Sequence, residues 1–106
     1  MTKIERTPQQ LVLKSGSTTL ILDKEAGKVV RRRKVLMWAM KPMEHPLAEI
    51  ADVKVDTAVD RASGVEVCST MLIMRAGAGW ALPAADKKDA ATTASAVREF
   101  LGIRPA

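Results

Sequence analysis

The sequence predicts an α+β domain: a bent antiparallel β-barrel or sandwich of about six to seven strands, capped by a C-terminal α-helix. Two observations carry this prediction. Short apolar runs, separated by glycine, proline or serine turns, are typical of strands joined by hairpins. Beyond residue 86 the apolar spacing changes to that of a helix, in an alanine-rich stretch. Because short turns join antiparallel neighbours, the sheet should be antiparallel.

The size and composition of the chain suit one folded domain. The chain has 106 residues, of which 47% are apolar, enough for one core. Residues 1–9 are polar and are expected to form a flexible N-terminal segment, so that the domain spans residues 10–104. The longest fully apolar run, VLMWAM, has six residues and is too short to cross a bilayer. The protein is therefore expected to be soluble and cytoplasmic.

The first strands are expected over residues 11–15 and 17–23, with a turn between them. A longer hairpin loop follows, in which Gly27 can supply a positive φ angle. The next strand is expected over residues 29–41. PMEHP should then break the pairing, because proline cannot sit inside a central strand.

The clearest strand signal lies in IADVKVDTAVD, residues 50–60. Its apolar and β-branched residues alternate with charged ones, which predicts a half-buried strand with one face turned inward. The inward set comprises Val53, Val55, Thr57 and Val59. Strands over residues 65–75 and 80–83 should follow. Within the first of these, MLIM is apolar on both faces and is expected to be covered from both sides.

The C-terminal helix is predicted with both of its ends. Asp86 suits the N-cap, and Gly102 stands where a helix is terminated by a glycine. The face toward the sheet should be a stripe of small residues that ends in larger ones. Its members are Ala90, Ala94, Val97 and Leu101. We expect Val97, Phe100 and Leu101 to plug the open end of the barrel together.

Three short motifs resemble those of the small bacterial pleckstrin-homology-like domains. The first is a Pro-Leu-x-x-Ile-x-x-Val pattern, and the others are a strand ending in Leu-Pro and a helix ending in Phe-Leu-Gly. They correspond here to Pro46, Leu47, Ile50 and Val53, to Leu82 and Pro83, and to Phe100, Leu101 and Gly102. The resemblance covers roughly residues 11–103. It implies a split, bent barrel closed by the helix, and a partner strand bound at a sheet edge beside that helix.

Four consecutive basic residues lie in VVRRRKVLMW, residues 29–38. One interpretation is a solvated strand end that discourages edge-to-edge pairing, with the strand entering the core only from Val35 onward. The other is binding of a phosphate or an anionic lipid headgroup, for which arginine offers paired donors. Phosphoinositide-binding eukaryotic pleckstrin-homology domains resemble this hairpin in carrying a lysine followed by Arg-x-Arg. The candidate phosphate-binding residues are Lys24, Lys28, Arg31 and Arg33.

The net charge of +5 favours anionic partners in general. It is compatible with weak contact with an anionic membrane. Sequence-tolerant binding of single-stranded nucleic acid relies on exposed aromatic side chains, and this chain has only three aromatic residues. Trp38 and Trp80 lie in apolar strands and Phe100 lies in the helix, so we expect no specific nucleic acid partner.

The sequence offers little for catalysis, and no enzyme activity, metal or cofactor is expected. His45 is the only histidine and Cys68 the only cysteine, so no set of nitrogen and sulfur ligands can form. The pattern of its strand buries Cys68. The acidic residues of the 50–60 strand are spaced four apart, about 13 Å along a strand, too far to share a proton. They are Asp52, Asp56 and Asp60.

The function that remains is a non-catalytic interaction module that binds a protein partner or itself. Met40 and Met43 flank the proline loop and could supply adaptable apolar contacts to such a partner. The alternative is binding of an anionic headgroup or phosphate through the basic hairpin around residues 24–34.

Overall fold

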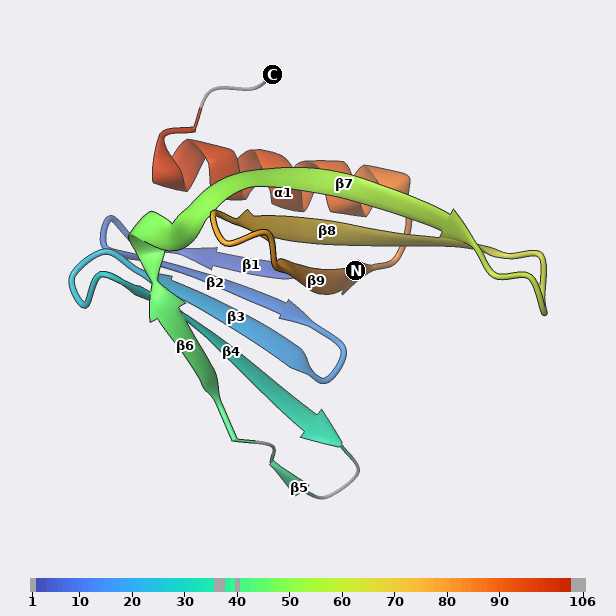
Figure 1. The fold of residues 1–106 in the computed structure, drawn as a ribbon, viewed down its shortest axis with the longest axis horizontal. Helices are drawn as coiled ribbons and strands as arrows, with labels where there is room; N and C mark the ends of the chain where they lie inside the picture. Colours follow the sequence, from blue (N-terminus) through green and yellow to red (C-terminus); the bar gives the residue numbers. More distant parts are fainter. Residues whose placement is uncertain (1, 36–37, 40, 104–106) are drawn as a thin grey trace.

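The computed structural model describes residues 2–35, 38–39 and 41–103. Two antiparallel sheets and a C-terminal helix form an α+β sandwich (Figure 1). No ladder between described residues joins the two sheets, so the expected barrel is not closed. The sheets instead meet face to face where β2 and β3 approach β9, and the hydroxyl of Ser15 donates to the carbonyl of Pro83 there.

The first sheet is built from consecutive hairpins. Its strand order is β1-β2-β3-β4, and two further short strands, β5 and β6, pair with β4. Alternate leucines of β2 and β3 face the core, because directly opposite residues share a face of the sheet. The strands are β1 (Lys3–Arg6), β2 (Gln10–Ser15), β3 (Thr18–Asp23), β4 (Lys28–Val35), β5 (Trp38–Ala39) and β6 (Met43–Pro46).

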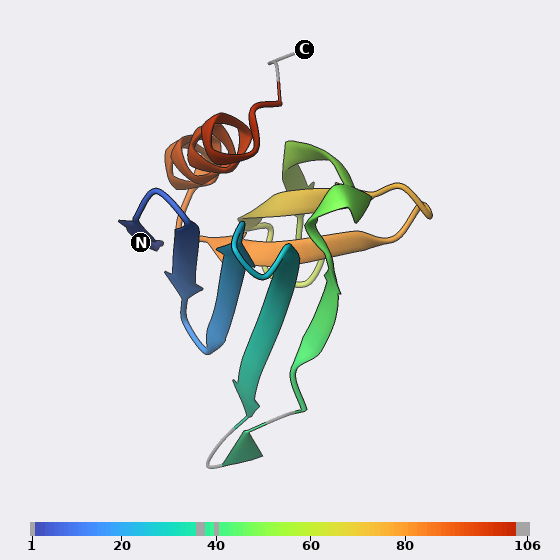
Figure 2. The same ribbon diagram turned by 90° about the vertical axis from the view of Figure 1, so that its left-hand side faces the viewer.

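The second sheet follows a short 3-10 helix, η1 (Leu47–Glu49), and has the order β7-β8-β9. Its strands are β7 (Ile50–Val59), β8 (Glu66–Met74) and β9 (Gly79–Ala84). Val53, Leu72 and Leu82 on its inner face are fully buried. Figure 2 shows the second sheet and the helix lying across one end of the first sheet.

The helix α1 (Lys87–Leu101) packs on the inner face of the second sheet. The hydroxyl of Thr70, in β8, donates to the carbonyl of Ala90 at 3.2 Å. Both predicted helix ends are present: the carboxylate of Asp86 accepts from the amide of Asp89, and Gly102 has a φ angle of 72°. The buried stripe differs at its end, because Phe100 is 2% exposed whereas Leu101 is only half-buried. Of the three residues expected as the plug, Val97 and Phe100 are buried in the core, whereas Leu101 packs against it only in part.

The N-terminal segment, expected to be flexible, forms strand β1 and pairs with β2. Its start is held by a buried carboxylate. The amide of Thr2 lies 3.1 Å from both carboxylate oxygens of Asp89, and its hydroxyl donates to the same carboxylate at 2.9 Å. Polar composition alone did not show that a residue 87 positions away would fix this segment.

Two other local expectations differ from the structure. MEHP, expected to break the pairing, forms β6, whose proline is its last residue and which pairs only with β4. An edge strand of this kind tolerates proline because one side of it needs no ladder. MLIM, expected to be covered on both faces, is fully buried on one face only, since Met71 and Ile73 are half-buried.

Candidate functional site

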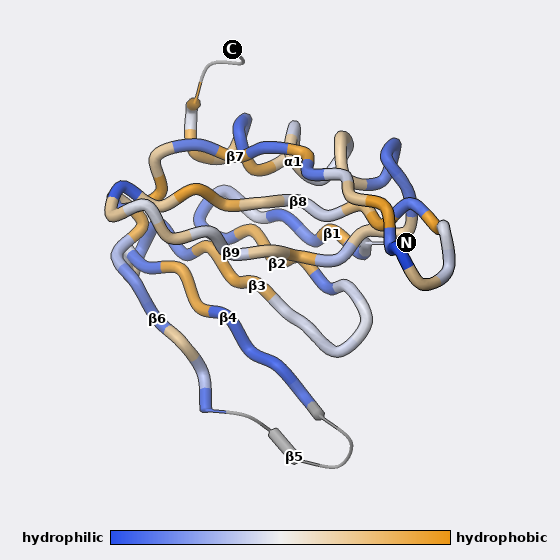
Figure 3. Tube along the Cα trace, turned by 45° about the vertical axis from the view of Figure 1, so that its right-hand side comes forward, coloured by the Kyte–Doolittle hydropathy of each residue, from blue (hydrophilic) through white to orange (hydrophobic). Residues whose placement is uncertain are grey.

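Strand β4 is buried in its first half and exposed in its second half. Val29 and Val30 are buried, whereas the residues from Arg32 to Lys34 are exposed. Figure 3 shows the same change as a hydrophobic first half and a hydrophilic second half. The expectation that this strand enters the core only from Val35 onward was therefore wrong. The first half is buried because it pairs with the apolar part of β3.

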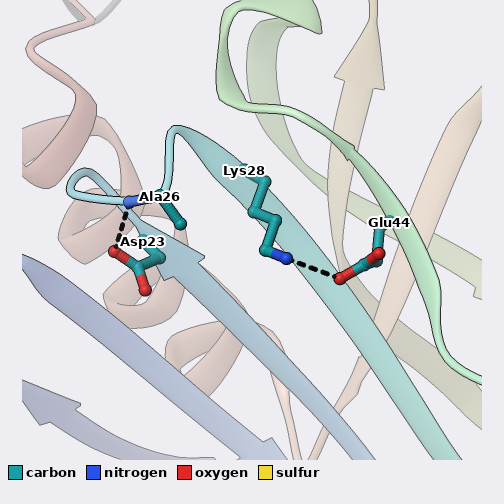
Figure 4. Close-up of polar contacts among 4 residues, drawn as sticks. All are labelled: Asp23, Ala26, Lys28 and Glu44. Atoms are coloured by element: carbon teal, nitrogen blue, oxygen red, sulfur yellow. Dashed lines mark hydrogen bonds and ion pairs between the residues drawn. The ribbon is translucent and has the colours of Figure 1, made fainter.

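Two of the four predicted phosphate-binding residues lie at the β3–β4 hairpin, Lys24 in the turn and Lys28 at the start of β4, and both have other contacts. The carboxylate of Asp23 accepts from the amides of Glu25 and Ala26, which orders the turn (Figure 4). The ammonium of Lys24 lies 4.5 Å from the ring centroid of Phe100. The ammonium of Lys28 lies 2.9 Å from the carboxylate of Glu44, in β6 (Figure 4).

Arg31, the third predicted residue, lies between the two sheets. Its position opposite Leu20 places it on the core face of β4. Its guanidinium carbon is 5.3 Å from the ring centroid of Trp80, and its Nη2 is 2.9 Å from the thioether sulfur of Met43. The ring of His45 meets the same Trp80 edge-on at 5.1 Å between centroids. Arg31 therefore belongs to the packing between the sheets.

Arg33, the fourth predicted residue, lines a cavity of about 530 Å³ at the far end of β4. The cavity walls hold four cationic side chains, two hydroxyls and one proline. They are Ser17, Thr19, Arg32, Arg33, Lys34, Lys41 and Pro42. No ion pair between described residues involves any of these four cationic groups. The structure thus does not bring the four predicted residues together, and it gives Arg33 new neighbours.

Part of this cavity could have been found from the sequence. Once residues 24–27 are read as the loop of a hairpin that pairs Asp23 with Lys28, Thr18 and Thr19 fall opposite Arg33 and Arg32. Lys41 could not have been found, because it follows the β4–β5 connection and reaches the cavity only through the fold.

A second surface lies at the tip of the β7–β8 hairpin, which projects beyond the rest of the sandwich (Figure 1). Val59, Val65 and Val67 are 64%, 59% and 54% exposed there. The turn is ordered by Asp60, whose carboxylate accepts from the amide of Ala62 and the hydroxyl of Ser63. Alternation along β7 placed Val59 on the inward face. Val59 is exposed because the end of β7 projects beyond the helix and the first sheet, which cover the earlier part of the strand (Figure 1).

Of the two methionines predicted to contact a partner, only Met43 lies within the described residues. Met43 is 42% exposed on β6, and its sulfur is the atom that Arg31 approaches. Met40 lies outside the described residues, and so does the side chain of Trp38.

The groups considered for catalysis are separated. The Nδ1 of His45 is 3.4 Å from a carboxylate oxygen of Glu49, and Cys68 lies in the other sheet. Within residues 2–35, 38–39 and 41–103, no three His, Cys, Asp or Glu side chains are grouped to hold a metal. In that same part of the chain, no helix is long and apolar enough to span a membrane.

The Cys68 thiol should resist labelling in the folded protein. Burial raises its pKa, and the Glu66 carboxylate, 3.6 Å from the sulfur, raises it further. A thiol without thiolate character reacts slowly. Alkylation followed by mass spectrometry should therefore show slow modification in buffer and fast modification in denaturant. Glu66→Gln should remain slow, because the burial is unchanged. Fast labelling of the folded wild type would contradict the buried position of Cys68.

Comparisons with protein-family models, curated proteins and solved structures gave no match. The class that the fold and surfaces define is an α+β sandwich with one cationic cavity and one projecting apolar hairpin among its described residues.

Proposed function

We propose that this chain is a non-catalytic interaction module that binds a protein partner or a second copy of itself. We further propose that its fold is of the pleckstrin-homology-like kind. The order of elements supports this second point: a sheet centred on β2, β3, β4 and β6 precedes the three strands β7 to β9 and the terminal helix.

The exposed β7–β8 hairpin is the observation that supports protein binding. Its three valines leave apolar surface in water on both faces of the hairpin tip, because Val59 lies opposite Glu66 whereas Val67 lies opposite Ala58. Clustered exposed apolar side chains are typical of protein contact sites, whereas single ones are ordinary. The charged neighbours Arg61 and Glu66 flank them, as polar residues flank the centre of many interfaces.

A triple substitution tests this function. Serine at Val59, Val65 and Val67 should abolish both self-association, followed by sedimentation velocity, and capture of host proteins, followed by mass spectrometry. Val12→Ser is the control, because Val12 is a half-buried apolar side chain on β2 of the first sheet, away from the hairpin. It should retain binding, and both variants should unfold cooperatively. If the serine hairpin binds as well as the wild type, or if the wild type binds nothing, the proposed function fails.

The cationic cavity favours a second candidate function, the binding of phosphate or of an anionic lipid headgroup. Two arginines and two lysines border one hollow together with two hydroxyls, a donor set suited to phosphate oxygens. The site differs from the hairpin proposed from the sequence, because Lys24 and Lys28 lie at the opposite end of β4 and already have partners.

Charge-matched variants test this second candidate. Arg33→Gln with Lys41→Gln should abolish binding, whereas Lys24→Gln with Lys28→Gln removes the same charge elsewhere and should preserve it. Titration with inorganic phosphate tests the free anion, and sedimentation with phosphatidylserine vesicles tests the membrane. Equal weakening by both pairs, with binding lost at physiological salt, would show only adhesion due to the net charge.

A further inference from the structure

Strand β7 lies at the edge of its sheet, since it pairs only with β8. Its first half is protected on the open side. The amide of Val53 donates to the carboxylate of Asp52 at 2.8 Å, and the carbonyl of Val53 accepts from the guanidinium of Arg98. Neither partner belongs to β8. The backbone groups of Val53 therefore point away from the sheet and are already occupied.

The second half of β7 is open. In an antiparallel ladder, successive residues direct their backbone groups to opposite sides. Val55, Thr57 and Val59 therefore point the same way as Val53. No hydrogen bond from a described residue outside the strands reaches their amides or carbonyls. Thr57 is exposed and Val59 is 64% exposed, so a second strand can reach this edge.

The charges along this half of β7 select one pairing with a copy of itself. When two copies run antiparallel with Thr57 opposite Thr57, Val55 faces Val59 of the other copy. Lys54 then faces Asp60, and Asp56 faces Ala58. Opposite charges and β-branched pairs across strands are stabilising.

The neighbouring registers are each disfavoured. Centring the pair on Asp56 sets two Asp56 carboxylates opposite one another, and centring it on Ala58 sets Asp56 opposite Asp60. Like charges in these positions are destabilising. Centring it on Val55 would require the backbone groups of Val53, which Asp52 and Arg98 already occupy.

We propose that two copies of the chain associate through the open half of β7, antiparallel and with Thr57 on the two-fold axis, to form one continuous six-stranded sheet. This inference rests on the proposed interaction function and names its partner as a second copy. The arrangement is isologous, because both copies use the same surface, so it stops at a dimer. In that dimer the open half of β7 is paired in both copies.

Two variants of one residue test the register. Ala58→Asp places a carboxylate opposite Asp56 of the other copy, whereas Ala58→Lys places an ammonium there. Both change the same exposed position, so their effects on the monomer should be similar. The dimer dissociation constant, measured by sedimentation equilibrium, should rise at least about twofold for Ala58→Asp and fall at least about twofold for Ala58→Lys.

A cysteine on the axis gives an independent readout. Thr57→Cys should form a disulfide-linked dimer under mild oxidation, because directly opposite Cα atoms lie within disulfide range. The substitution is made together with Cys68→Ala, since Cys68 is the cross-strand neighbour of Thr57 within one copy. Thr92→Cys, on the exposed face of α1, is the control and should stay unlinked.

The outcomes separate the inference from the function on which it rests. A dimer that both Ala58 variants leave unchanged and that Thr57→Cys does not link would overturn the β7 pairing and leave self-association standing. A wild type that stays monomeric at every concentration would also overturn the inference. Binding to other proteins is then decided by the hairpin variants alone.

Discussion

Replacing Phe100 with alanine is expected to lower the free energy of unfolding by about 3–5 kcal/mol, the usual cost of emptying a large buried aromatic site. The ring is 2% exposed and belongs to the main hydrophobic core. It also joins the helix to the first sheet, since Lys24 and Arg6 lie 4.5 Å and 5.8 Å from its centroid. Its loss therefore leaves a cavity and also removes two cation–π contacts.

Urea denaturation of Phe100→Ala and Leu101→Ala measures this difference. Leu101 is the control, because it occupies the adjacent position on the same helix but is only half-buried. We expect Leu101→Ala to cost less than Phe100→Ala. A larger loss for Leu101→Ala would mean that Leu101, and not Phe100, makes the larger contribution to the core.

Replacing Asp89 with asparagine is expected to cost about 2–4 kcal/mol near neutral pH, because hydrogen bonds to a buried charged group are among the stronger ones. The side chain is 4% exposed. Its carboxylate accepts from the amide and hydroxyl of Thr2 and from the amide of Ala85. An asparagine side chain offers only one acceptor oxygen, so it cannot satisfy all of these donors.

The loss should depend on pH in a defined direction. Burial raises the pKa of Asp89, but the hydrogen bonds from Ala85 and Thr2 outweigh it, so its pKa lies below the ordinary value of 3.8. A carboxylate with a lowered pKa stabilises the fold above its unfolded pKa and loses that contribution as the pH falls through the folded value. The difference in unfolding free energy between the wild type and Asp89→Asn should therefore be full at neutral pH and shrink below about pH 4.

Glu25→Gln is the control, because Glu25 is an exposed carboxylate in the β3–β4 turn, outside the proposed dimer edge. It should match the wild type in urea denaturation at neutral pH. An Asp89→Asn difference that is constant from neutral to acid pH would show that the pKa of Asp89 is the same in the folded and unfolded states, and would contradict the proposed anchoring of the N-terminal segment.

The parts that could be predicted from the sequence are local ones. The alternation in β7 and the helix between Asp86 and Gly102 arise from the spacing of apolar residues and from caps within a few residues of each end. The antiparallel pairing followed from the short turns. These features depend on contacts between near neighbours, so the pattern of residue types is enough to predict them.

The candidate sites were predicted less well. Of the four residues proposed to bind phosphate, only Arg33 lines the cationic cavity, because the other three have partners in distant segments. The partner of Lys24 is on the helix, and that of Arg31 is on β9. A run of basic residues shows how much charge is present, but the packing of other elements decides which charges remain available.

The sequence by itself determined the class of the fold: antiparallel hairpins, one C-terminal helix, and an aliphatic core with few aromatics. The tertiary structure alone decided that the sheets stay open, that Asp89 holds the N-terminal strand, and that Leu101 is less buried than Phe100. It also decided which half of β7 is left unpaired. The difference lies in the sequence separation of the contacts involved. Strand and helix patterns are set by neighbours along the chain. Burial, ion pairing and open strand edges depend on which segments distant in the sequence pack against them.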